Sequence, residues 1–351
     1  MTDKYIQLPS SLTGPFAWIG RDLATAPDQW LTSFTEKEVW ELENAASYFI
    51  DTELDISEIS KEYFPLSTLR KKFDQIKLDL IHGRGFEVVR GLPVQTYSLK
   101  KSAIIFCGIG CYLGNMRSQN ARGHILGHVR DEGADAKDPN ARIYQTSERQ
   151  TFHTDSSDVV GLLCLKEAKE GGDSLLVSIA TIYNEMYKRR PDLTALLFEP
   201  IATDRRGEIP EGEKPYFEIP VLSWHAGYLS GMYQRQYIES AQRFADVPRL
   251  TAKHLEALDL FDGLANNPEL NLQMRLKPGD IQFVHNHSLL HDRTGFIDWP
   301  DLEQKRHLLR LWLSVDGDRP LPDCFKQRFG SITVGDRGGI ITKDTKLTIP
   351  L

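Results

Sequence analysis

The sequence has few cysteines, no long hydrophobic run and no excess of basic residues, and each absence excludes a class of protein. Its four cysteines show no CxxC spacing, which predicts free thiols in a reducing compartment rather than a disulfide framework. The longest apolar run spans residues 103–113, so it is too short to cross a bilayer and predicts a buried helix. Residues 1–5 show no charged-then-apolar signal pattern, and we therefore expect a cytoplasmic protein with no membrane partner.

The charge balance and the composition narrow the class further. The 351 residues include 42 Lys and Arg against 49 Asp and Glu, which gives a net charge of −7. Binding to a phosphate backbone needs a basic patch, so we expect no nucleic-acid partner. A hydrophobic content of 40% with 26% charged residues is typical of a packed globular chain. Whether the protein forms a homo-oligomer is left open.

Helical patterns come first along the chain and short strand patterns follow. Thr35 and Glu38 form a capping box before an amphipathic pattern at 35–50, and residues 66–80 repeat that pattern. The later strand patterns are residues 86–89, 159–165, 174–178, 281–284 and 307–315. We predict an α+β fold with a double-stranded β-helix, or jelly roll, as its core and flanking helices.

The predicted organisation is one domain that spans residues 1–351. Its N-terminal portion, residues 1–100, is expected to be helical and to pack on the core. Residues 204–245 are rich in Gly, Pro, Tyr and Arg and show few periodic runs, so we interpret them as a long insertion that acts as a lid. A single domain is favoured because candidate site residues at 153 and 291 lie on opposite sides of any obvious boundary.

An imidazole and a carboxylate, His153 and Asp155, stand two residues apart at the end of a predicted strand. Residues i and i+2 of a strand point to the same face, so both side chains can reach one ion. About 1.4 such triplets are expected by chance from 10 His and 49 acidic residues. A second triplet, His254-x-Glu256, falls on a predicted helix, where i and i+2 diverge. We interpret it as two solvated side chains.

His291 lies far downstream and supplies a second imidazole. Two His and one carboxylate on one face of a metal leave three positions open, which is the ligand set of a non-haem Fe(II) oxygenase. His285 and His287 alternate as two metal ligands on a strand could, so they form a rival candidate site. The alternative is that one imidazole lies in the core and the other at the edge of a sheet. Arg306 and Arg310 follow on a later strand. Both could be solvated strand residues with no role in a site. Arg310, however, lies in an apolar run, where a charged side chain more often has a partner.

At this point the chain resembles the TauD/TfdA-like Fe(II)/2-oxoglutarate-dependent dioxygenases. The pieces that carry the resemblance appear in the family's order over about half of the chain. They are Phe152-His153-Thr154-Asp155, Gly171-Gly172-Asp173-Ser174, Pro278-Gly279-Asp280-Ile281, His291-x-Arg293-Thr294 and Arg306-His307-Leu308-Leu309-Arg310.

The resemblance implies roles for six of these residues. It implies an iron-binding and catalytic triad made of His153, Asp155 and His291. Ser174 matches the hydroxyl position that touches the distal carboxylate of 2-oxoglutarate, and Arg306 matches the arginine that pairs with it. Arg310 matches a second arginine near the co-substrate or the primary substrate, and which arginine pairs with 2-oxoglutarate is left open. The implied reaction oxidises, most simply hydroxylates, a small molecule with Fe(II), 2-oxoglutarate and O₂, and releases succinate and CO₂.

Elementary chemistry supports these roles. The far carboxylate of 2-oxoglutarate needs a fixed cation, and a guanidinium group offers two parallel donors. This argues against two alternatives, a zinc-dependent hydrolase with the same triad and a catalytically silent jelly-roll binding protein, since neither needs such a clamp. Asp155 argues against a halogenase, which by family analogy leaves that position without a carboxylate. Desaturation and ring chemistry stay open beside hydroxylation.

We expect the primary substrate to be small, polar and anionic, a carboxylate or an amino acid derivative. Two segments gather cations, amides and aromatic rings near the site in sequence. They contain Arg117, Gln119, Asn120, Arg122 and His124 before the triad, and Arg205, Arg206, Lys214, Tyr216, Trp224, Tyr228, Tyr233 and Arg235 in the predicted lid. The alternative for most of them is a solvated loop position.

Overall fold

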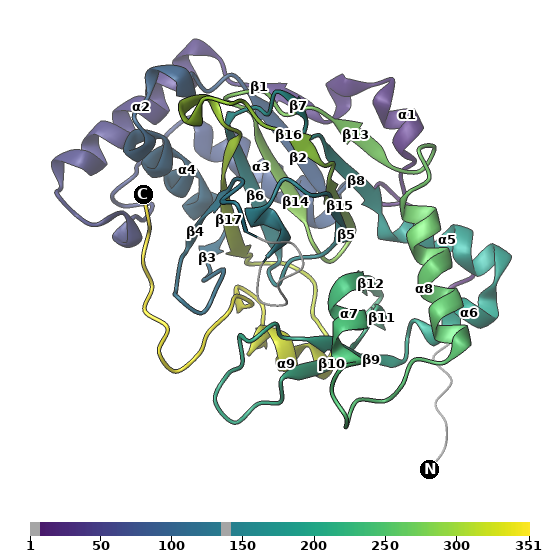
Figure 1. Cartoon of the computed structure of the whole chain (residues 1–351). Coiled ribbons are helices and arrows are strands. Elements are labelled where there is room, and N and C mark those ends of the chain that lie inside the picture. Colours follow the sequence, from purple (N-terminus) through teal and green to yellow (C-terminus); the bar gives the residue numbers. More distant parts are fainter. Residues whose placement is uncertain (1–7, 135–141) are drawn as a thin grey trace.

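Two β-sheets face each other across the centre of the molecule (Figure 1). The structure, a computed structural model, describes residues 8–134 and 142–351. In these residues the larger sheet has the order β1-β2-β14-β6-β17-β3, with β4 also paired to β17, and the smaller has the order β13-β8-β15-β5. The larger sheet consists of β1 (Leu31–Ser33), β2 (Phe86–Arg90), β3 (Asn115–Met116), β4 (Leu126–Val129), β6 (Val159–Lys166), β14 (Ile281–His285) and β17 (His307–Ser314). The smaller consists of β5 (Gln150–His153), β8 (Ser174–Ser178), β13 (Leu272–Met274) and β15 (Leu289–Arg293).

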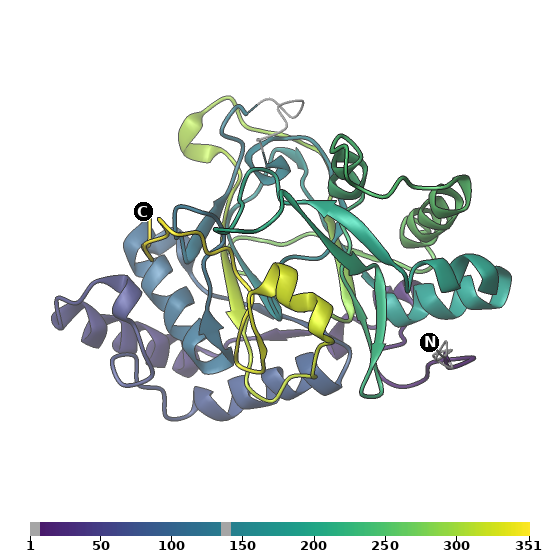
Figure 2. The ribbon, with the colours of Figure 1, turned by 90° about the horizontal axis from the view of Figure 1, so that it is seen from below.

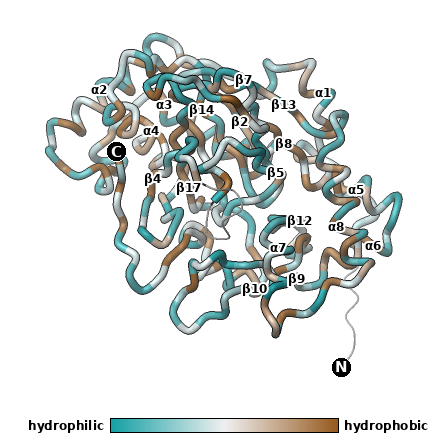
Figure 3. The backbone as a smooth tube through the Cα atoms, viewed as in Figure 1, coloured by the Kyte–Doolittle hydropathy of each residue, from teal (hydrophilic) through white to brown (hydrophobic). Residues whose placement is uncertain are grey.

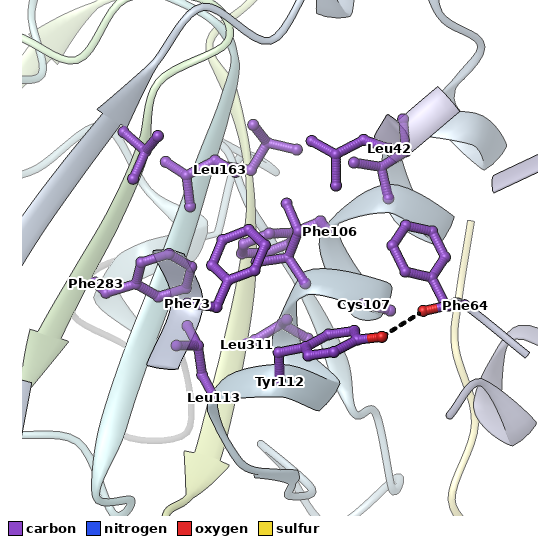
Figure 4. Close-up of a cluster of buried hydrophobic side chains, with 14 of the residues drawn as sticks. Leu42, Phe64, Phe73, Phe106, Cys107, Tyr112, Leu113, Leu163, Phe283 and Leu311 are labelled. Atoms are coloured by element: carbon purple, nitrogen blue, oxygen red, sulfur yellow. Dashed lines mark hydrogen bonds between the residues drawn. The ribbon is translucent and has the colours of Figure 1, made fainter. Parts of the chain in front are cut away.

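A layer of helices covers the outer face of the larger sheet. It consists of α2 (Glu36–Asp51), α3 (Leu69–His82) and α4 (Leu99–Leu113). Most of α4 is buried, because its apolar residues face both the sheet and the other two helices. Figure 4 shows Phe106 of α4 beside Phe73 of α3 and Phe283 of the sheet. The hydroxyl of Tyr112 donates to the carbonyl of Phe64 at 2.9 Å, so the polar atom of this buried ring is satisfied.

A second layer of helices covers the smaller sheet. It consists of α5 (Ile179–Arg189), α6 (Pro191–Leu196) and α8 (Ala252–Ala265). Val177 and Leu290 of the sheet pack in one cluster with Tyr183 of α5 and Phe261 of α8. The helical patterns in the sequence arise from these buried faces, since the opposite faces of the same helices are exposed to water.

The space between the two sheets holds a third apolar cluster. Phe86, Val284 and Trp312 of the larger sheet meet Leu176 and Leu289 of the smaller one. The short helix α1 (Gly20–Ala24) closes one edge of this cluster. Hydrophobic residues are concentrated in these central strands in Figure 3. The arrangement is the double-stranded β-helix core that the sequence predicts.

The predicted insertion, residues 204–245, contains regular structure that its sequence pattern did not reveal. The elements of this region are β9 (Pro200–Asp204), β10 (Tyr216–Pro220), β11 (Leu222–His225), β12 (Tyr228–Gly231) and α7 (Arg235–Ala241). The C-terminal helix α9 (Lys326–Phe329) packs on β10, where Phe325 and Phe329 contact Phe217 and Ile219. Figure 2 shows this end of the molecule, with α9 in yellow. Whether the segment moves as a lid stays a prediction.

The N-terminal portion is not purely helical. Its strands β1 and β2 form the edge of the larger sheet, and the assignment of one domain over residues 1–351 stays a prediction. Residues 1–5, where no signal pattern was found, lie outside the described residues. In the described part, no helix combines the length and the hydropathy needed to span a bilayer. The remaining short strands are β7 (Glu170–Gly171), β16 (Phe296–Ile297), β18 (Ile332–Thr333) and β19 (Asp336–Arg337).

Candidate active site

The three predicted ligands come together at one end of the smaller sheet. His153 is the last residue of β5 and lies directly opposite His291 of β15 in the strand register. Nε2 of His153 lies 3.9 Å from Oδ1 of Asp155, and Nε2 of His291 lies 3.7 Å from Oδ2 of the same carboxylate. One ligand atom from each residue lies within 4.8 Å of the others, so a single ion can reach all three.

A hydrogen bond fixes which nitrogen of His153 faces the other two residues. Nδ1 of His153 lies 2.8 Å from the carbonyl oxygen of Thr151, and only a protonated nitrogen can donate to that acceptor. Nε2 therefore carries the free electron pair, which accepts a hydrogen bond from the side-chain amide of Gln150 at 2.9 Å and would be available to a metal once that amide moves away. Burial, and then the nearby His291, lower the pKa of His153 to about 3. The imidazole is thus neutral at physiological pH, which is the form that binds a metal.

Asp155 lies beyond the end of β5, so strand alternation does not place it as the sequence argument assumed. Its backbone N–H donates to Oδ1 of Asn286 at 3.0 Å, and the indole N–H of Trp312 donates to its Oδ2 at 2.8 Å. Burial opposes the charge of Asp155, but the Arg310 guanidinium at 3.7 Å and the two imidazoles hold the pKa of Asp155 well below its usual range. The carboxylate is therefore anionic and directed at the two histidines.

This donor set fits a metal ion. Two neutral imidazole nitrogens and one carboxylate oxygen converge from one side, and such a set with open positions is typical of non-haem Fe(II). Nδ1 of His291 is buried and has no hydrogen-bond partner among the described atoms. The geometry is therefore compatible with the predicted site at these three residues.

A narrow cavity extends from the triad toward Arg306. Its middle is apolar, formed in part by Val160, Leu162 and Leu308, and Ser174 and Arg306 lie along it. The hydroxyl of Ser174 donates to Oε1 of Gln282 at 3.0 Å. The cavity is charged at both ends and apolar between them, which suits a short molecule with a carboxylate at each end.

Arg306 lines this cavity and has no ion-pair partner among the described residues. Its side chain is buried, its Nη1 has no hydrogen-bond partner, and no carboxylate in the described residues forms an ion pair with it. Burial lowers the pKa of Arg306 to about 10, so it stays positive at neutral pH. Arg293 lines the same cavity, and both guanidinium groups lie over the Phe296 ring, at 4.8 and 5.1 Å. The sequence analysis gave Arg293 no role, although its position in the His291-x-Arg293-Thr294 motif was a signal.

A second cavity shares His153, Asp155 and Arg310 with the first. It is bounded by Arg142 and Arg328 as well, together with uncharged side chains. These uncharged neighbours are Ile143, Tyr144, Gln150, Thr154, Ser156, Thr203, Phe217, Met232, Gln234, Tyr237 and Trp312. Sequence reasoning missed Arg142 and Arg328, because neither belongs to a motif or to a periodic pattern.

The cations and aromatic residues that the sequence analysis placed around the substrate lie elsewhere. None of the residues named in those two segments lines either of the two cavities beside the triad, as far as the chain is described. Most have partners of their own: Arg235 pairs with Asp262, and Tyr233 donates to the same carboxylate at 2.6 Å. Some members of the set still contact residues that line the cavities. Oε1 of Gln119 accepts from Nε of Arg310 at 2.7 Å, and the backbone N–H of Tyr233 donates to the hydroxyl of Thr154 at 3.0 Å.

The rival histidine pair is committed to a buried ion-pair network. Nε2 of His285 lies 3.0 Å from Asp318, and Nε2 of His287 lies 2.9 Å from Asp158. Asp158, His287 and Asp318 converge as ligands could, but Arg337 pairs with both carboxylates, at 2.6 and 2.9 Å. The guanidinium group of Arg337 therefore neutralises the two carboxylates that a metal ion would need as ligands. The other triplet also has a structural role, since His254 completes the capping box of α8.

The comparison with known proteins agrees with this fold and site. Residues 52–312 match the family described as "Taurine catabolism dioxygenase TauD, TfdA family", and the chain belongs to that family. "FR-33289 synthase" of Streptomyces rubellomurinus is 32% identical over 90% of this chain and 94% of its own length. "Taurine hydroxylase-like protein SAT17" of Stachybotrys chartarum is 33% identical over 87% of this chain and 80% of its own length.

Two further matches are more distant. "Uridine-5'-phosphate dioxygenase" of an Amycolatopsis species is 29% identical over 48% of this chain and 62% of its own length. The structure of an asparagine oxygenase, solved with Fe(II), 2S,3S-3-hydroxyasparagine and succinate, superposes with a TM-score of 0.61 at 17% identity. It covers 81% of this chain and 93% of that one. The chain is thus a dioxygenase that uses Fe(II), 2-oxoglutarate and O₂ on a small molecule, as the sequence predicted.

Proposed function

We propose that His153, Asp155 and His291 hold the Fe(II) ion of a hydroxylase for a small anionic molecule. The observation that carries this proposal is the convergence of two imidazoles and one carboxylate where two cavities meet. Bound Fe(II), together with 2-oxoglutarate and O₂, supplies the oxidising chemistry and releases succinate and CO₂. The part of the protein is to place the reactants and to exclude side reactions.

The cavity that extends to Arg306 is the proposed site of 2-oxoglutarate. The distal carboxylate would pair with the guanidinium of Arg306, whose Nη1 lacks a partner. It would also accept a hydrogen bond from the Ser174 hydroxyl, which would turn away from Gln282 to donate it. Arg310 borders both cavities and lies 3.7 Å from Asp155, so its charge is shared between the triad and the substrate side. This supports Arg306, rather than Arg310, as the partner of 2-oxoglutarate.

The second cavity is the proposed site of the primary substrate. Arg142, Arg310 and Arg328 give it a positive lining, and Asp155 is the one acidic residue that lines it within residues 8–134 and 142–351. An anionic substrate fits this balance. The expected amino acid substrate fits less well, because its ammonium group would meet no carboxylate other than a proposed metal ligand.

The cavity that extends to Arg306 argues against the two alternative functions, the zinc hydrolase and the silent binding protein. A zinc hydrolase with this triad, or a silent binding protein, has no use for a buried guanidinium at the far end of an apolar channel. A cytoplasmic location also stays a proposal, supported by four cysteines that form no disulfide.

The test is to assemble the proposed site without O₂. Purified protein with Fe(II) and 2-oxoglutarate should develop a weak visible charge-transfer band, and adding O₂ should release succinate. His153→Ala and His291→Ala should each abolish the band because each removes one of three ligands. His254→Ala, in the surface triplet, is the matched control and should keep it.

Two results would contradict this proposal. A band that persists in both ligand variants would mean that the ion binds elsewhere, with His285 and His287 to be changed next. A protein that shows no band and releases no succinate with Fe(II), yet hydrolyses esters or amides with Zn(II), would be the hydrolase instead.

A further inference from the structure

Three guanidinium groups reach the proposed substrate cavity from separate segments of the chain. Arg142 lies just before the 3-10 turn Ile143–Gln145, Arg310 lies in β17, and Arg328 lies in the C-terminal helix α9. The family match ends at residue 312, so Arg328 lies beyond the residues that the family model matches. The inference below rests on the proposed iron and 2-oxoglutarate sites.

The three cations differ in how they are neutralised. Arg142 forms an ion pair with Glu208. Arg310 faces Asp155, but that carboxylate is assigned to the metal. Arg328 has no ion-pair partner in the described residues; its Nε donates to the uncharged hydroxyl of Ser156 at 2.6 Å. Burial, and then the nearby Arg142 and Arg205, lower the pKa of Arg328 to about 9, so Arg328 carries its charge at neutral pH without compensation.

Arg310 and Arg328 therefore leave two positive charges in the cavity. The two side chains contact consecutive residues, since Nη1 of Arg310 lies 3.7 Å from Asp155 and Nε of Arg328 lies 2.6 Å from Ser156. Both side chains line the same cavity, so one compact group bound there can meet both. Arg310 is buried and Arg328 is half-buried, and the planar forks of their guanidinium groups match the oxygens of a phosphoryl group.

We infer that the substrate carries a dianionic phosphoryl group, a phosphate monoester or a phosphonate, which Arg310 and Arg328 bind together. Arg328 determines the preference for two negative charges over one. A phosphate monoester carries a charge of about −1.5 to −2 at neutral pH because its second pKa is near 6. A phosphonate reaches the same charge at a somewhat higher pH, because carbon withdraws less electron density than the ester oxygen. The name of one relative, uridine-5'-phosphate dioxygenase, includes a phosphate monoester. A carboxylate, as the sequence analysis expected, or a sulfonate would neutralise only one of the two cations.

The experiment compares ligands that differ by one charge. Methylphosphonate, its monomethyl ester, methyl phosphate and malonate are titrated by calorimetry into the full chain loaded with Fe(II) and 2-oxoglutarate without O₂. We expect the dianionic phosphoryl probes to bind at least roughly tenfold more tightly than the ester. Their affinity should rise with pH through the second phosphoryl pKa. Methyl phosphate and methylphosphonate then show whether an ester or a carbon–phosphorus group is preferred, and either supports the inference.

Variants on one helix separate this role from a structural one. Arg328→Gln should remove both the preference for the dianion and its pH dependence, and Arg328→Lys should keep part of each. Lys326→Gln makes the same charge change on α9 at an exposed side chain paired with Asp323, and should keep both.

The inference fails if wild-type protein binds the ester as tightly as methylphosphonate or binds malonate most tightly. It also fails if Arg328→Gln leaves the preference unchanged. The charge-transfer band is recorded first in every sample: its absence from wild-type protein would refute the proposed iron site, whereas a normal band without phosphoryl preference would refute this inference alone.

Discussion

Trp312 and Arg310 direct the one carboxylate of the triad. The indole N–H of Trp312 donates to Asp155 at 2.8 Å, while the guanidinium of Arg310 lies 3.7 Å from the same oxygen. Arg310 is itself oriented by Gln119 and lies over the ring of Tyr144 at 4.6 Å. At this scale the proposed metal site depends on neighbours that make no contact with the metal, and such contacts commonly tune ligand orientation.

Arg306 is the residue whose substitution we expect to weaken the binding of 2-oxoglutarate most. Arg306→Ala should raise the KM for 2-oxoglutarate by an amount equivalent to about 2–5 kcal/mol, since truncation leaves a buried carboxylate unpaired. Ser174→Ala should cost only about 1 kcal/mol, the contribution of one hydrogen bond. Succinate release measured against 2-oxoglutarate concentration gives both values.

Lys305→Ala is the control for that pair, because Lys305 precedes Arg306 but does not line the cavity that leads to the triad. It should leave the KM near the wild-type value. A larger rise in KM for Arg310→Ala than for Arg306→Ala would mean that the roles of the two arginines are reversed.

Strand β17 connects the core to the site through its alternation. Leu309 and Leu311 point to the helical layer and pack in its core cluster, while Arg310 and Trp312 point to the space between the sheets. Because side chains alternate along a strand, one element both anchors the larger sheet and supplies two side chains to the site. A shift of its register by one residue would exchange these faces.

Helix α4 approaches its neighbours so closely that one of its glycines cannot carry a side chain without rearrangement. A Cβ at Gly108 would lie 2.5 Å from the ring of Phe64. Gly108→Ala should therefore lower the free energy of unfolding by about 1–3 kcal/mol through overpacking. Urea denaturation measures the change.

Gly263 of α8 is the matched control, since a Cβ there would meet no atom within 4 Å. Gly263→Ala should raise the stability by up to about 1 kcal/mol, because alanine has the higher helix propensity. Equal effects at the two positions would show that close packing around α4 is not the cause.

The C-terminal segment is tied to the rest of the molecule by a buried network. Arg337 pairs with Asp158, which follows β5, and with Asp318, which follows β17. His285 and His287 complete the network, and burial is the largest cause that lowers the pKa of His285 to about 4. These contacts hold the chain near α9, and thereby Arg328, against the two sheets.

Removing the cation of this network should destabilise the whole molecule. Arg337→Met should lower the free energy of unfolding by about 3–5 kcal/mol, because two buried carboxylates lose their partner. Arg117→Met removes a pair with the exposed Asp336 and should cost only about 0–1 kcal/mol. Thermal and urea unfolding of the metal-free proteins provide the comparison, and similar losses in both would contradict a central role for the network.

The sequence by itself determined the elements whose cause is local. Capping residues and apolar periodicity predicted α2, α3 and the buried helix α4, and apolar runs predicted β6, β8, β14 and β17. The ordered motifs also selected His153, Asp155, His291, Ser174 and Arg306 for the site. The predictions of helices and strands succeeded where a pattern reports burial directly. The roles of the site residues, whose types the chemistry restricts, stay predictions.

Tertiary structure decided what depends on contacts between distant segments. The position of Asp155 comes from Asn286 and Trp312 rather than from its strand, and the short hairpins within 204–245 gave no periodic signal. The lining by Arg142 and Arg328 arises because a loop and the C-terminal helix pack beside the triad. A charged residue in a loop has the same local sequence character whether it faces water or a cavity, so only the folded chain distinguishes the two.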